Sequence, residues 1–69
     1  MDTRLHSVYF EVERKQITLD LKANQQGAFL RITEAVSGRY NSIVIPATGL
    51  ELFRDALNEV INSARLYST

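Results

Sequence analysis

The sequence predicts an α+β fold, a four-stranded antiparallel meander followed by one C-terminal helix. Up to about residue 46, apolar residues alternate with polar ones, which is the period of a strand with one buried face. Beyond residue 48 the apolar residues recur every three or four positions, as they do in an amphipathic helix. Short polar connections separate the alternating stretches, so we expect successive strands to pair as neighbours.

The first strand is predicted over residues 8–12. Val8, Phe10 and Val12 there alternate with Tyr9 and Glu11. A polar corner follows, and the residues before the strand show no clear period. We therefore expect the N-terminal segment to be frayed.

The second and third strands, residues 16–24 and 28–35, are predicted to form a hairpin. Their inward residues are the aliphatic positions of the two stretches: Ile17, Leu19, Leu21, Leu30 and Ile32. Gln25, Gln26 and Gly27 form the connection, in which glycine tolerates a positive φ. This alternation leaves Phe29 and Arg31 on the outer face.

Residues 36–41 are predicted to form a loop, and residues 42–46 a short fourth strand that ends at Pro46. Thr48 and Glu51 have the spacing of a capping box, which predicts that the helix starts there. One side of this helix is apolar and is expected to form core and dimer contacts: Leu50, Phe53, Leu57, Val60, Ile61 and Ala64.

The chain is small enough that its core alone is expected to be marginal. A 69-residue domain buries a low fraction of its surface, and the sequence has no cysteine and one histidine, so disulfides and a metal site offer no help. A single helix also covers about half the width of four strands. We expect a two-fold homodimer through helix and sheet, with a monomer of thin core as the alternative.

The net charge is zero, yet the charges are unevenly distributed. Residues 14–41 carry five basic and two acidic side chains, a local charge of +3: Arg14, Lys15, Lys22, Arg31 and Arg39 against Asp20 and Glu34. No apolar run is long enough to span a membrane, and the N-terminus lacks the apolar core of a signal peptide. These features predict an intracellular protein without a membrane partner, whether nuclear or cytoplasmic being left open.

Enzymatic activity is not expected. Catalytic and metal centres need several histidine, cysteine or carboxylate groups together. His6 is the single histidine and is expected to be a solvated residue of the N-terminal segment, while Asp20 and Glu34 fall on opposite faces. We predict no cofactor and no metal.

The outer face of the central hairpin carries the candidate binding site. Proteins that bind single-stranded nucleic acid combine cationic side chains, which contact the phosphates, with an exposed aromatic ring on which a base can stack. The predicted face has these groups: Lys22, Asn24, Phe29 and Arg31. In the alternative interpretation, the cations are solvated charges near Asp20 and Phe29 is covered by a loop or a partner. Tyr9 is a second possible platform, and Tyr40 and Tyr67 are placed in loop and tail.

The stretch ITLDLKANQQGAFLRITEA, then SIVIPATGLELFRDALNEVI, closely resembles a repeat of the purine-rich-element-binding (Pur-alpha) family. The shared pattern is a strand ending in Lys-x-Asn, a short turn to Gly, x-Phe-Leu-Arg-Ile, and a late Phe-Arg-Asp-x-Leu. The resemblance covers roughly residues 8–63 and identifies residues 1–69 as a single PUR repeat, with a core of about residues 8–64.

This resemblance implies a Whirly-like β-β-β-β-α repeat, two copies of which interlock into a PUR domain that binds purine-rich single-stranded DNA or RNA. It implies that Lys22 and Asn24 contact nucleic acid and that Phe29 stacks on or wedges between bases, with Arg31 matching a family arginine. Gln26 and Ala28 stand where binding repeats often carry cations. The alternative is therefore a dimerisation module with weak or no nucleic-acid binding. A single repeat fits either a complete short protein or part of a longer one.

Overall fold

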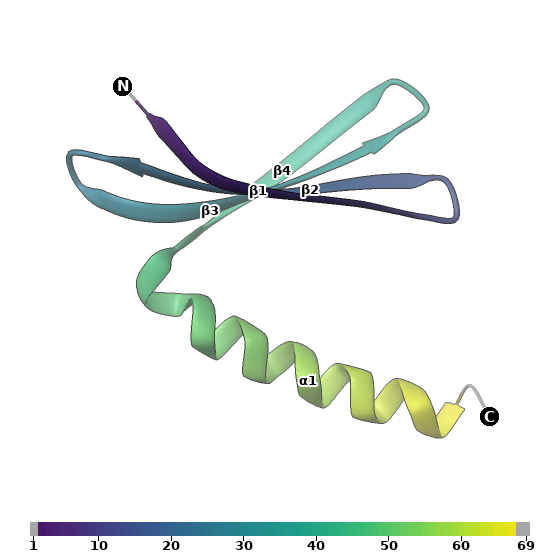
Figure 1. Ribbon diagram of the computed structural model, residues 1–69. Coiled ribbons are helices and arrows are strands. Elements are labelled where there is room, and N and C mark those ends of the chain that lie inside the picture. Colours follow the sequence, from purple (N-terminus) through teal and green to yellow (C-terminus); the bar gives the residue numbers. More distant parts are fainter. Residues whose placement is uncertain (1, 68–69) are drawn as a thin grey trace.

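A computed structural model describes residues 2–67. Four antiparallel strands precede one long helix (Figure 1), as the sequence predicts. The elements are β1 (Thr3–Val12), β2 (Lys15–Asn24), β3 (Gly27–Val36), β4 (Arg39–Pro46), a 3-10 turn (Ala47–Gly49) and α1 (Leu50–Tyr67). The strands lie in the order β1-β2-β3-β4, so the sheet is a meander. None of the described helices is long and apolar enough to cross a bilayer.

Each pair of neighbouring strands is joined by a two-residue turn. In the β2–β3 hairpin Asn24 pairs with Gly27, whose φ of 131° favours glycine. In the β3–β4 hairpin Ser37 and Gly38 both have positive φ, as a type I′ turn requires. The predicted loop over residues 36–41 is therefore wrong, because Ser37 adopts a conformation unusual for serine and β4 starts at Arg39.

Strand β1 is longer than predicted and contains an irregularity. It begins at Thr3, so His6 lies within the strand, paired with Leu21, rather than in a frayed segment. The register shifts between Arg4 and His6, which leaves Leu5 as the extra residue of a β-bulge. The bulge breaks the period-2 pattern, and for this reason sequence periodicity locates only the second half of the strand.

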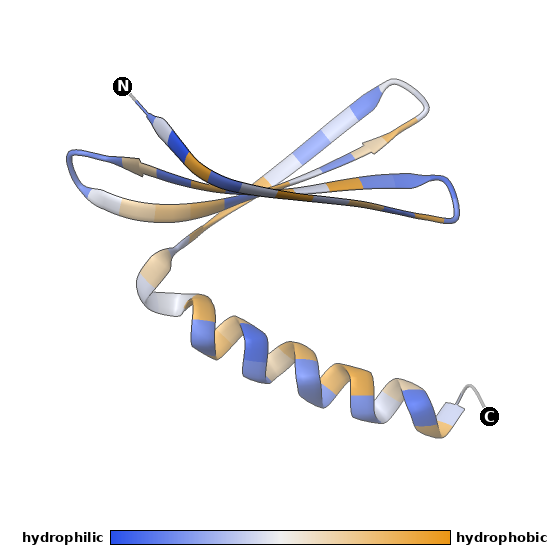
Figure 2. Cartoon of the chain, in the orientation of Figure 1, coloured by the Kyte–Doolittle hydropathy of each residue, from blue (hydrophilic) through white to orange (hydrophobic). Residues whose placement is uncertain are grey.

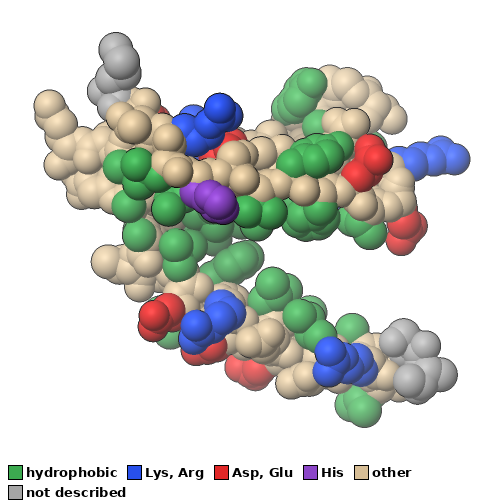
Figure 3. All heavy atoms as spheres, in the orientation of Figure 1, with side chains coloured by type: hydrophobic (Ala, Val, Ile, Leu, Met, Phe, Trp, Pro, Cys, Tyr) green, Lys and Arg blue, Asp and Glu red, His purple; other side chains and the backbone are tan. Residues whose placement is uncertain are grey.

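One face of the sheet is apolar and lies toward α1. The register places aliphatic residues opposite one another across the strands, for example Val8 with Leu19, and Leu19 with Ile32. Figure 2 shows apolar positions along one side of the helix as well. In Figure 3 these two apolar surfaces face each other, and open space separates the sheet from the C-terminal half of the helix.

This apolar face is only partly covered within one chain, because the aliphatic residues of β2 and β3 are half-buried. None of residues 2–67 is buried, and Phe10 and Val12 on β1 keep 45% and 49% of their surface exposed. The residues predicted as the helix contact surface are likewise open to solvent, with Leu57 47% and Val60 62% exposed. A single chain therefore leaves unfilled the core that the hydrophobic pattern predicts.

The helix starts slightly later than predicted. Thr48 lies within the 3-10 turn Ala47–Gly49, and α1 begins at Leu50, with Glu51 in its first turn. At about 1.5 Å per residue, its 18 residues span about 27 Å, comparable to the length of a strand in the sheet. The helix is therefore long enough to lie along most of the length of a strand, in its own sheet or in that of a second copy.

Candidate nucleic-acid interface

The strand register places the predicted site on the face of the sheet that points away from α1. Lys22 on β2 lies directly opposite Phe29 on β3, and Asp20 lies opposite Arg31. Directly opposite side chains are about 4.5 to 5.5 Å apart at Cβ, so Lys22 and Phe29 are neighbours. The sequence-based assignment of this face agrees with the register.

Three of the four predicted residues line one hollow of about 420 Å³ at the end of the central hairpin. They are Asn24, Phe29 and Arg31. The remaining walls come from the β2–β3 turn, the start of β3 and β4: Gln26, Gly27, Ala28, Val44 and Pro46. Lys22 does not line the hollow but stands beside it, across the ladder from Phe29. The hollow thus combines an aromatic ring, an amide and a guanidinium group.

Arg31 forms no direct ion pair with the facing carboxylate of Asp20. Asp20 instead accepts a hydrogen bond of 2.7 Å from the Ser7 hydroxyl, and the Arg31 Nη1 donates to Ser42 Oγ at 3.4 Å. The Arg31 Nε has no hydrogen-bond partner although it is shielded from solvent. The guanidinium group of Arg31 therefore lies on this face without a direct carboxylate partner, and such a group can bind an anionic ligand.

Asn24 has a structural role in addition to the binding role predicted for it. Its side-chain oxygen accepts a hydrogen bond of 2.8 Å from the backbone N–H of Gln26, which shapes the β2–β3 turn. An asparagine followed by a short turn to glycine is a recognisable signal for this arrangement. With its oxygen engaged, Asn24 presents its amide N–H groups as donors to a ligand.

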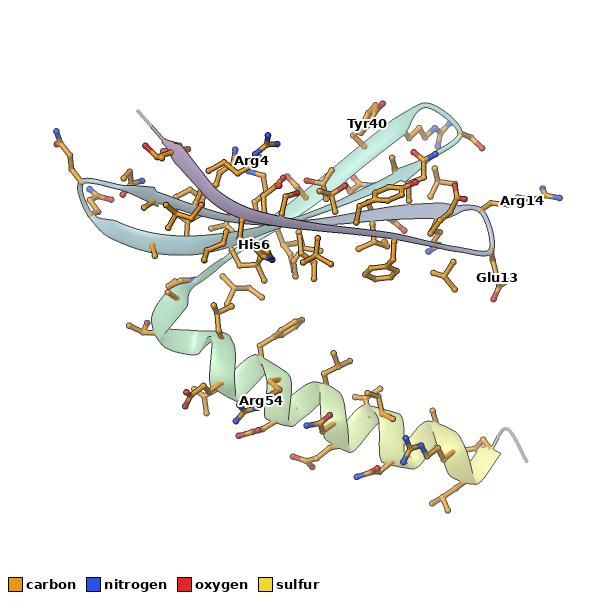
Figure 4. The ribbon with its side chains drawn as sticks, viewed as in Figure 1. Arg4, His6, Glu13, Arg14, Tyr40 and Arg54 are labelled. Atoms are coloured by element: carbon orange, nitrogen blue, oxygen red, sulfur yellow. The ribbon has the colours of Figure 1, made fainter. Side chains whose placement is uncertain are left out.

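Two tyrosines lie on the same outer face, away from the hollow. Tyr9 on β1 pairs with Thr18 and is 59% exposed. Tyr40 lies in β4 opposite Ala35, not in a loop as predicted, and is 74% exposed. Figure 4 shows Tyr40 on the side of the sheet away from the helix. The pairing separates both rings from Lys22 and Phe29, so they do not belong to the same cluster.

An ion pair occupies one end of the opposite, helix-facing side. Lys15 Nζ lies 2.8 Å from Glu34 Oε2. The hydrogen bond and charge of Glu34 raise the pKa of Lys15, and those of Lys15 lower the pKa of Glu34 below its ordinary value of 4.5. A hydrogen bond from Asn41 also lowers the pKa of Glu34. The pair places two charges at the margin of the apolar face.

Replacing Lys15 with alanine should raise the pKa of Glu34 toward 4.5, because the largest stabilising influence on its carboxylate is removed. A carboxyl whose pKa is depressed by folding stabilises the fold above its unfolded pKa, and this contribution disappears as pH falls through the lowered value. The acid limb of the stability curve should therefore flatten in the variant. Nuclear magnetic resonance titration of the Glu34 carboxyl carbon measures the shift.

The matched control is Arg14→Ala, which removes a neighbouring cation that forms no ion pair with the described residues. It should leave the pKa of Glu34 unchanged. An unchanged pKa in Lys15→Ala would contradict the ion pair.

The sequence matches a known protein family and several of its members. A family model described as PurA ssDNA and RNA-binding protein matches residues 1–67. The chain is 37% identical over 62 residues to "Transcription factor Pur-alpha 1" of Arabidopsis thaliana, covering 90% of this chain and 21% of that protein. It is 40% identical over 65 residues to the human "Transcriptional activator protein Pur-alpha", covering 84% of this chain and 20% of that protein.

A third relative, the human "Purine-rich element-binding protein gamma", is 38% identical over 73 residues, covering 81% of this chain and 21% of that protein. The chain thus spans about a fifth of the length of these relatives. Their names describe nucleic-acid binding and transcription rather than catalysis, in agreement with the expectation that the chain is not an enzyme. The match over nearly the whole sequence shows that the chain belongs to the PurA family of single-stranded DNA- and RNA-binding proteins.

Proposed function

We propose that this chain is a single PUR repeat that binds purine-rich single-stranded DNA or RNA as a homodimer, through Lys22, Asn24, Phe29 and Arg31 of each protomer. The observation that carries the proposal is the strand register, which sets Phe29 beside Lys22 and in one hollow with Asn24 and Arg31. The names of its relatives support the same ligand class, and their description as transcription factors supports an intracellular setting.

Each of the four residues supplies a different interaction. Phe29 offers a ring face on which a base stacks, and such stacking is worth about 1 to 3 kcal/mol per base. Lys22 and Arg31 attract the phosphates through their positive charges. The amide N–H groups of Asn24 donate to acceptors on the edge of a base, such as the N7 of a purine.

The uncovered apolar surfaces support the homodimer. A second copy would cover the helix-facing side of the sheet and the exposed stripe of α1, which includes Phe53, Leu57 and Ile61. Removing apolar surface from water on association is favourable. The outer face would stay accessible in such an arrangement, because the apolar surfaces lie on the other side of the sheet (Figure 3).

A binding titration tests the proposal. We expect the protein to bind a short purine-rich single strand more tightly than a pyrimidine-rich strand of equal length. Affinity should fall as salt rises from about 50 to about 200 mM, because phosphate binding releases counterions. Lys22→Ala should weaken binding and flatten this salt dependence, by about 0.7 in the slope of log K against log salt for each phosphate that is no longer bound.

The second candidate is a dimerisation module with weak or no nucleic-acid binding. Gln26 and Ala28 favour it, because these residues bring no positive charge to the walls of the hollow. This candidate predicts a stable dimer that shows no retention of either strand even at the lower salt concentration. The titration therefore separates the two candidates.

A further inference from the structure

Arg4 lies next to the candidate interface, in a segment that sequence periodicity does not assign to a strand. Its backbone pairs with Lys22, and Lys22 in turn pairs with Phe29, which pairs with Pro46. These four residues form one row across all four strands. Figure 4 shows Arg4 on the side of the sheet away from α1 and His6 on the side toward it. Arg4 therefore shares the outer face with the predicted site.

The β-bulge in β1 is the reason for this placement. In a regular strand Arg4, His6 and Val8 would share one face, the apolar face that looks toward the helix. His6 pairs with Leu21 and Arg4 with Lys22, so the extra residue Leu5 moves Arg4 to the opposite face. The bulge has the effect of placing a guanidinium group beside an ammonium group.

The pairing of Arg4 with Lys22 is electrostatically unfavourable in the free protein. Like charges directly opposite one another destabilise a sheet. Neither side chain forms an ion pair with another of residues 2–67, whereas Lys15 and Arg54 elsewhere in the chain are paired with Glu34 and Asp55. An anion bound between Arg4 and Lys22 would relieve the repulsion.

We propose that Arg4 is a further nucleic-acid contact, a cation that binds a backbone phosphate together with Lys22 beside the base stacked on Phe29. The inference rests on the proposed function of the outer face. Gln26 and Ala28 leave the turn side of the hollow without charge, and Arg4 supplies positive charge from the β1 side of Lys22. A phosphate, with its diffuse negative charge and several acceptor oxygens, suits a guanidinium and an ammonium group.

The test compares Arg4→Gln, Arg4→Lys and Arg14→Gln with the unmodified protein, using one purine-rich single strand at about 50 and about 200 mM salt. Arg4→Gln should flatten the slope of log K against log salt by about 0.7 for the phosphate that it no longer binds. Over this fourfold change in salt, the affinity ratio of unmodified protein to variant should fall by about 2.5-fold. Arg4→Lys should restore the slope, and Arg14→Gln, in the β1–β2 turn at the far end of β1, should leave it unchanged.

A second measurement separates binding from folding. Because Arg4→Gln removes a repulsion, the thermal midpoint of the variant without nucleic acid should not fall. A slope equal to that of the unmodified protein in Arg4→Gln, or no restoration by Arg4→Lys, would overturn the inference. Lys22→Ala and Phe29→Ala are measured in the same series. If neither of those two substitutions weakens binding, the proposed function of the whole face fails. If they weaken binding and Arg4→Gln does not change the slope, only the proposed role of Arg4 as a phosphate contact fails.

Discussion

Replacing Phe29 with alanine should lower the affinity for a purine-rich single strand by about 5- to 150-fold for each base that stacks on the ring. This range corresponds to a stacking free energy of about 1 to 3 kcal/mol. Phe29 lies on the outer face of the sheet, opposite Lys22 and Pro46, and so does not belong to the apolar side. The fold should survive, which circular dichroism checks, and fluorescence anisotropy with a labelled strand measures the change in affinity.

Tyr40→Ala is the matched control for this variant. It removes an aromatic ring from the same face, but from a position that is 74% exposed and outside the hollow. Its affinity should equal that of the unmodified protein. A folded Phe29→Ala protein that binds as tightly as the original would show that the nucleic acid uses another surface.

Replacing Leu57 with aspartate should dissociate the proposed homodimer. In one chain Leu57 is 47% exposed, so a carboxylate there would cost little if the protein were a monomer. In the proposed dimer it is covered, and an unpaired buried charge costs about 3 to 5 kcal/mol in each protomer. The dissociation constant should therefore rise by about 10⁴-fold or more, and the chain should unfold at low micromolar concentration. Sedimentation and circular dichroism together measure both effects.

Asn58→Asp places the same charge one residue further along α1, on the polar side of the helix. The dimer should persist in this control. Two results would contradict the shared core: a folded monomer in the unmodified protein at low micromolar concentration, or a Leu57→Asp variant that remains a stable dimer.

Most of the fold follows from local patterns that a single sequence carries. The β2–β3 hairpin is predictable because strict alternation in residues 16–24 and 28–35 flanks a short turn that ends in Gly27. The helix is predictable because its apolar residues recur at helical spacing. The outward position of Phe29 and Arg31 follows from the same alternation, whereas the pairing of Phe29 with Lys22 depends on the strand register, which only the structure provides.

The errors occur where the backbone departs from regular geometry. Leu5 interrupts the alternation of β1, so periodicity starts the strand at Val8 and does not reveal the position of Arg4. Ser37 adopts a φ of 50°, which its residue type does not signal, so the tight β3–β4 turn has the sequence pattern of a longer loop. The sequence also does not reveal that the side chain of Asn24 accepts a hydrogen bond within the turn. An asparagine that shapes a turn and one that contacts a ligand look the same in sequence.

The absence of any buried residue among positions 2–67 also affects how the protein responds to dilution. If the partner completes the core, folding and association form a single equilibrium, governed by mass action rather than by a fixed unfolding free energy. Each tenfold dilution of protomer then removes about 1.4 kcal/mol of stability per dimer. A strand of nucleic acid that engages both protomers would offset this destabilisation, so the ligand would help to preserve the fold that recognises it.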